Sequence, residues 1–120
     1  VAINAGAVMT VINLNRRLTL ERALQAPDGA GGFLQNWQAL GELWANVDAR
    51  TGRIRKGSGN AVSVVRYRIV VRAAPDGSDM RPHADQRFTD GAQAFVIDAV
   101  APHDTSGLYL ECWARVEVVA

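Results

Sequence analysis

Apolar and polar residues alternate along two long stretches of the chain, 62–72 and 108–119. In the second stretch the apolar set is Leu108, Leu110, Cys112, Ala114, Val116 and Val118. A period of two is typical of a β-strand with one buried and one solvent-facing side, and the first stretch is also rich in β-branched residues. Strands of this kind must bury one face, so these two stretches require a sheet that closes or packs around an apolar core.

Four shorter segments extend the pattern. We expect strands over residues 14–22, 42–48, 87–89 and 94–100, in the last of which Phe95, Ile97 and Ala99 share one parity. Asp90 and Gly91 form a hairpin dipeptide, and residues 27–32 have the composition of a loop. The sequence therefore predicts a mainly β fold, a small antiparallel barrel or sandwich of about six strands with long loops. One short helix has room at the N-terminus or in 33–40.

The length of 120 residues, 48% of them apolar, suits one small core. We expect an N-terminal arm over 1–13 and a single domain over 14–120. No run of about eighteen apolar residues and no leader-like pattern occurs, so we expect a soluble protein with no membrane partner. The single cysteine excludes an internal disulfide.

No set of catalytic residues is apparent. Cys112 lies on the apolar parity of its strand, where a free cysteine acts as a small hydrophobe. His83 and His103 each neighbour a proline in a turn-like segment, and neither has zinc-ligand spacing with Cys112. Residues 28–32 lack the lysine and hydroxyl residue of a phosphate loop. We therefore expect no enzyme activity, no metal and no cofactor.

The charges nearly cancel, with 13 basic and 12 acidic residues, which argues against whole-molecule attraction to nucleic acid. The basic residues are unevenly placed. Residues 51–60 are glycine-rich, and we expect a flexible loop over 50–60 that carries Arg50, Arg53, Arg55 and Lys56. Such a loop either reaches phosphates or an acidic neighbour, or is an ordinary solvated loop.

Arginine and tryptophan side chains mark a second candidate surface. Arg66, Arg68 and Arg72 share the polar side of their strand, where they either solvate the sheet or pair with acids of a neighbouring copy. Trp44 and Trp113 share parity with charged residues, so we expect partly exposed rings at a subunit interface. The Trp37 ring either anchors the core or lies at an interface with a partner.

Taken in order, the segments resemble the phage head–tail joining family, the small connectors also called head-closure or stopper proteins. The resemblance covers about 14–117 and depends on order and spacing. Its pieces are LNRRLTLER at 14–22, DGAGG at 28–32 before Trp37, LWANV at 43–47 leading to TGR at 51–53, YRIVVR at 67–72, Met80-Arg81, FVI at 95–97 and LEC at 110–112.

The resemblance implies a structural β-barrel protein at the head–tail interface of a phage or phage-like particle such as a gene transfer agent, assembled in the bacterial cytoplasm. It implies a homo-oligomeric ring, a hexamer or a dodecamer, below a portal or adaptor and above a tail terminator or tail tube, with packaged double-stranded DNA in its channel. The basic loop would face that DNA or a neighbour. The alternative from the residues alone is a nucleic-acid-binding barrel of the OB type, which would use Arg66, Arg68 and Arg72.

Overall fold

The computed structural model describes residues 12–57 and 60–119, with the backbone alone at 34, 51–57, 60–64 and 117–119. It contains six strands: β1 (Arg16–Pro27), β2 (Phe33–Gly57), β3 (Asn60–Arg72), β4 (Arg87–Thr89), β5 (Ala94–Pro102) and β6 (Tyr109–Val119). No helix occurs among the described residues, so a short helix in 33–40 was a wrong prediction. The expected arm over 1–13 falls mostly outside the described part.

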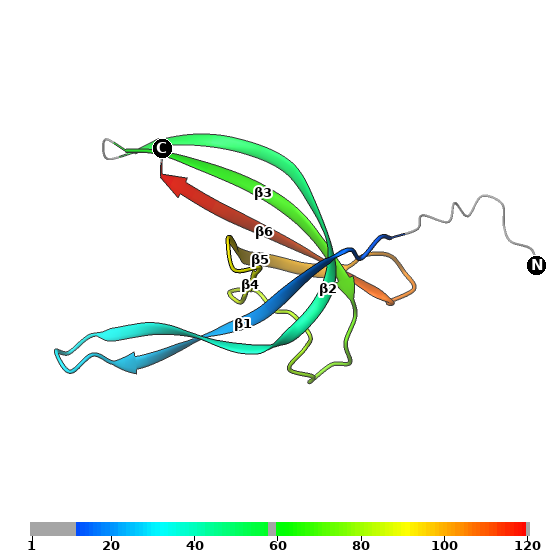
Figure 1. The fold of residues 1–120 in the computed structure, drawn as a ribbon, viewed down its shortest axis with the longest axis horizontal. Coiled ribbons are helices and arrows are strands. Elements are labelled where there is room, and N and C mark those ends of the chain that lie inside the picture. Colours follow the sequence, from blue (N-terminus) through cyan, green and yellow to red (C-terminus); the bar gives the residue numbers. More distant parts are fainter. Residues whose placement is uncertain (1–11, 58–59, 120) are drawn as a thin grey trace, which may run out of the picture.

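The strands close into a six-stranded barrel in the order β1-β2-β3-β6-β5-β4, and every neighbouring pair is antiparallel (Figure 1). The mainly β, six-stranded prediction is confirmed. Within the described residues, no helix is long and apolar enough to cross a membrane.

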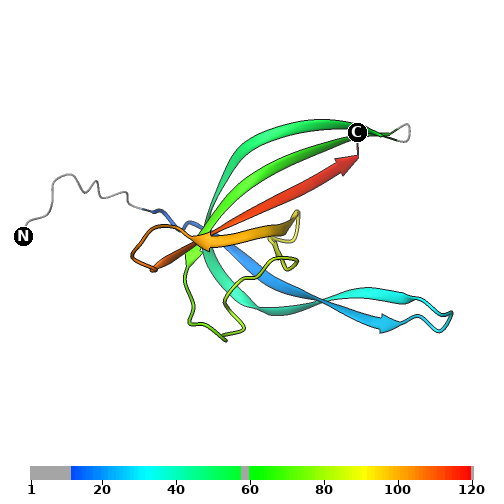
Figure 2. The same cartoon turned by 180° about the vertical axis from the view of Figure 1, so that it is seen from behind.

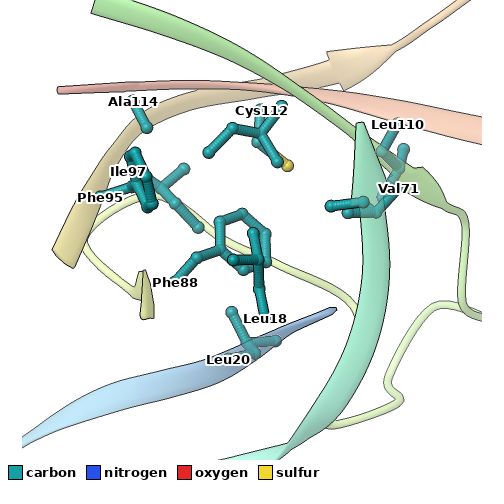
Figure 3. Packing of buried hydrophobic residues seen from close by; sticks show 11 residues of the cluster. Leu18, Leu20, Val71, Phe88, Phe95, Ile97, Leu110, Cys112 and Ala114 are labelled. Carbon is teal, nitrogen blue, oxygen red and sulfur yellow. The ribbon is translucent and has the colours of Figure 1, made fainter. Parts of the chain in front are cut away.

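The core lies where all six strands overlap, and the alternating residues supply it (Figure 3). Phe88 from β4 and Phe95 from β5 are fully buried, and the Tyr67 ring meets Phe95 edge-on at 5.1 Å between centroids. The remaining core members are Leu18, Leu20, Ala45, Ile69, Val71, Ile97, Leu110, Cys112 and Ala114. The prediction that Cys112 has a core role is confirmed.

Three β-bulges interrupt the ladders. The register skips Leu40 and Arg50 on β2 and Asp98 on β5. A bulge bends its strand and redirects the side chains that follow. Ala99, which follows the third bulge, is therefore exposed, and the prediction that it shares the buried face of Ile97 was wrong.

Two arms extend beyond the core, both built from the 25-residue strand β2 (Figures 1 and 2). One is the outer part of the β1–β2 hairpin. The other is a three-stranded sheet made by the far ends of β2, β3 and β6. The arms raise the radius of gyration to 17.1 Å, whereas a compact domain of this size has about 14 Å.

The prediction of a flexible loop over 50–60 was wrong for residues 50–57 and 60, which belong to strands of the second arm, while positions 58 and 59 lie outside the described residues. Residues 51–57 continue β2 and pair with β3 from Thr51↔Arg66 to Gly57↔Asn60. The β-branched residues of β3 provide a continuous partner strand, so the glycines and charges of this segment do not prevent strand formation.

Candidate interaction surfaces

The three predicted arginines of β3 lie on the outer side of the barrel. Arg68 lies within 3.5 Å of Asp48 from β2 and 3.4 Å of Glu111 from β6. Glu111 Oε1 also lies 3.2 Å from Nδ1 of His103. Arg68 is thus enclosed by two acids of its own chain, one on each neighbouring strand.

Two further arginines, Arg66 and Arg115, share one acidic partner. Arg66 and Arg115 stand directly opposite each other on β3 and β6. Like charges in such a cross-strand pair repel. The bulge at Asp98 places a carboxylate between them, with Oδ2 3.2 Å from Arg66 Nη1 and Oδ1 in contact with Arg115 Nη1. The bulge therefore supplies the counter-ion that this pair needs.

We call these six residues, Asp48, Arg66, Arg68, Asp98, Glu111 and Arg115, the charged band. Its three positive charges are matched by three negative charges from the same chain. Arg66 and Arg68, two of the three arginines on which the OB-type alternative depends, are neutralised in this way and offer little to phosphates, which weakens that alternative.

Aromatic side chains border the charged band. Trp44 is 53% exposed and Trp113 36% exposed, so the expected partial exposure of both rings is confirmed. The Arg17 guanidinium lies 5.8 Å from the Trp44 ring centroid, and that of Arg72 lies 5.5 Å from the Tyr109 ring centroid. Both distances lie within the range of cation–π contacts.

The predicted basic segment divides into two parts. Arg50 is the bulged residue of β2, and its Nε lies 3.5 Å from Asp48 Oδ2. Arg53, Arg55 and Lys56 lie on the strand that leads to the tip of the second arm, in register with Val64, Val62 and Ala61. Their side chains lie outside the described part.

The β1–β2 arm, which the sequence did not predict, is braced at its base by Arg87. The Arg87 Nε donates to Glu21 Oε1 at 2.6 Å, and the guanidinium lies 4.1 Å from the Trp37 ring centroid. Trp37 is half-buried at the base of this arm, with its ring against the Arg87 guanidinium. The available sequence signal was the scarcity of charge, because Asp28 is the one charged residue between 23 and 40.

Asp28 holds the glycine-rich turn of the β1–β2 arm. Asp28 Oδ1 accepts hydrogen bonds from the amides of Ala30 at 2.7 Å and Gly32 at 3.1 Å, which lower the pKa of Asp28. These two amides already have an acceptor, so the glycine-rich turn does not present them to a phosphate.

In the part of the chain that the structure describes, buried and titratable groups do not assemble into a reactive centre. Burial raises the pKa of the Cys112 thiol to about 12, so the thiol stays protonated and unreactive. Among residues 12–57 and 60–119, no cluster of three or more potential metal ligands occurs.

Comparison with known proteins identifies relatives of the whole domain. The family model described as phage head completion protein matches residues 9–117. A chain in the structure of the virion of a native gene transfer agent particle is 52% identical, with a TM-score of 0.80 over 90% of this chain and 98% of that chain. Protein SF1141 from Shigella flexneri 2a, 22% identical, shares the fold with a TM-score of 0.60 over 90% of this chain and 96% of that chain. The comparison with curated proteins gives no match.

Proposed function

Because the chain belongs to the phage head completion protein family, we propose that it is a structural subunit of the head–tail connector of a phage-like particle and acts without catalysis. The observation that carries this proposal is the 52% identity, over 90% of the chain, to a chain of a gene transfer agent virion. The geometry supports it, since the described surface presents strand faces, aromatic rings and projecting arms.

We further propose that copies of the chain form a ring, a hexamer or a dodecamer, between a portal or adaptor protein and a tail terminator or tail-tube protein. The outer side of the barrel suits contact with other proteins, because the charged band is neutral in sum and Trp44 and Trp113 border it. Partly exposed tryptophans are typical anchors of protein interfaces.

The tip of the β2–β3 hairpin is the part proposed to meet packaged DNA or an acidic surface of the adaptor. Arg53, Arg55 and Lys56 follow one another within four residues of β2, with no acidic residue among them. Arg50 lies beside Asp48, a carboxylate that it shares with Arg68, so its charge is partly offset within the chain. The triple variant R53A/R55A/K56A should lower the DNA content of particles, whereas Arg50→Ala is the matched control and should leave it unchanged. Equal DNA content in particles of the wild type, the triple variant and Arg50→Ala would refute this assignment.

Deletion of the gene, with complementation from a plasmid, tests the main proposal. We expect heads without tails and without retained DNA in electron micrographs, and normal particles after complementation. Normal particles in the deletion strain would exclude a connector role.

A further inference from the structure

The outer part of the β1–β2 hairpin, residues 21–39, is an isolated two-stranded ribbon, which we call the hairpin arm. Seven register pairs hold it together, from Glu21↔Ala39 to Pro27↔Phe33. Both of its faces are open to solvent, because Ala23, Leu24 and Gln25 are exposed in succession. A two-stranded ribbon alone in water is only marginally stable. We therefore expect this arm to be covered by a partner in the assembled state.

The composition of the hairpin arm fits a protein partner. Phe33 is 68% exposed and Leu24 is 41% exposed. Between residues 23 and 40 the one charge is that of Asp28, whose Oδ1 accepts from two turn amides. Monomeric proteins protect exposed strands with charged residues, and nucleic acid is bound by positive ones. Beyond its base, where Glu21 and Arg22 lie, the arm has neither feature, so it suits an uncharged protein surface.

The backbone of the hairpin arm is also available for pairing. On the β1 side, β4 pairs only with residues 19–21. On the β2 side, β3 pairs only from Ala45 onward. Within the described residues, both edges of the ribbon beyond these points lack a neighbouring strand, so each presents a row of N–H and C=O groups that can add to a sheet.

A complementary surface lies on the other arm of the same molecule. The last pair between β5 and β6 is Val96↔Arg115, and in the described part residues 116–119 pair with β3 alone. The edge of β6 is thus open there. Beside it lie Val65 and Val116, half-buried and paired with each other across β3 and β6. The open edge and its valines offer backbone groups and apolar side chains to such a ribbon, and Glu117 is the one charged residue of 116–119.

The two surfaces lie on separate, diverging arms, as both views show (Figures 1 and 2). A contact between two different surfaces is heterologous, and repeated around an axis it closes a ring. We propose that the hairpin arm of one copy packs on the open β6 edge and the adjoining valines of the next copy, and extends its sheet. This inference rests on the proposed connector function and names the surface that joins the subunits.

Site-specific photo-cross-linking in assembled particles tests the contact. Gln35, exposed in the hairpin arm, is replaced by p-benzoylphenylalanine, particles are purified and irradiated, and the products are identified by mass spectrometry. Leu108, 57% exposed and outside both surfaces, carries the same probe as a control. We expect Gln35 to give a product of twice 12.9 kDa, with the attachment at Val65 or in residues 116–119, and Leu108 to give none there.

The outcomes separate the two proposals. Suppose that the particles contain the protein, but position 35 cross-links only to a different protein or to none. That result overturns the assignment of a second copy as the partner and leaves the connector function standing. Particles that lack the protein overturn the connector function and this inference with it. As a second measure, Phe33→Asp should reduce incorporation into particles at least tenfold, while Phe33→Leu should retain it. Normal incorporation of the Asp variant would also overturn the contact.

Discussion

Arg87 determines how firmly the hairpin arm is held to the barrel, and its removal makes a quantitative prediction. The side chains of Arg87 and Glu21 are 27% and 16% exposed, and their 2.6 Å contact is a charge-assisted hydrogen bond in a partly desolvated site. Such a bond contributes about 1–2 kcal/mol after allowance for solvent screening. The stacking on Trp37 at 4.1 Å adds about 0.5–1 kcal/mol. We therefore expect Arg87→Ala to lower the free energy of unfolding by roughly 2 kcal/mol.

Urea unfolding followed by tryptophan fluorescence measures this loss of unfolding free energy. If that free energy falls by about 2 kcal/mol per M of urea, the loss lowers the midpoint urea concentration by about 1 M. Arg22→Ala is the control, because Arg22 is exposed and donates one hydrogen bond to Gln38 at 2.8 Å. Its cost should stay below about 0.5 kcal/mol. Amide hydrogen exchange should also accelerate in residues 21–39 of the Arg87 variant more than in the core. Equal costs for the two variants, or unchanged exchange in the arm, would refute the assignment of Arg87 as its brace.

Four further predictions concern the barrel itself. Phe88→Ala should cost about 3–5 kcal/mol in urea unfolding, because Phe88 is fully buried at the centre of the core; a loss below about 1 kcal/mol would contradict this. Gly41→Ala should cost about 1–3 kcal/mol, since a Cβ there would lie 2.6 Å from Met80 Sδ and the φ of Gly41 is +155°; Met80→Ala in the same chain should recover part of the loss. Turn amides lower the pKa of Asp90 in the folded chain below its ordinary 3.8. The ionised carboxylate therefore stabilises the fold above pH 3.8, and this stabilisation is lost as the pH falls through the lower pKa of the folded state. In unfolding curves measured over a series of pH values, Asp90→Asn should remove this pH dependence. Cys112 should resist a thiol-reactive disulfide reagent at pH 8 until urea unfolds the chain, because burial raises its pKa to about 12; rapid reaction of the native protein would show that the thiol is accessible.

The strands that surround the core could be predicted from the sequence because each has one buried and one exposed side. In β3 and β6 the alternation places Ile69, Val71, Leu110, Cys112 and Ala114 inside. β4 was expected at 87–89 and lies there. Burial on one side is the physical cause of the pattern, so the pattern is reliable where the barrel is closed.

The projecting arms could not be predicted in the same way. In residues 33–40 both sides of β2 face solvent over much of the segment, so no alternation is required and none is present. In residues 51–57 the glycines and basic residues indicated a loop, but the partner strand β3 determines the outcome. Pairing across the chain is a tertiary effect that local composition does not contain.

The bulges explain the detailed misses at the candidate site. The extra residue Asp98 turns Ala99 outward and brings a carboxylate between Arg66 and Arg115. The sequence indicated that the arginines share an outer face and left open whether their counter-ions come from a neighbouring copy. The structure supplies acids for Arg66 and Arg68 within the chain. The subunit-interface roles of all five candidates stay predictions: Trp44, Arg66, Arg68, Arg72 and Trp113.

Localisation of the chain within intact particles by cryo-electron microscopy tests the central claim most directly. The connector account predicts density for this barrel as a closed ring at the head–tail junction, with the hairpin arm of each copy against the next. Density for this fold in the capsid lattice or at the tail tip, or particles that contain none of this chain, would contradict it.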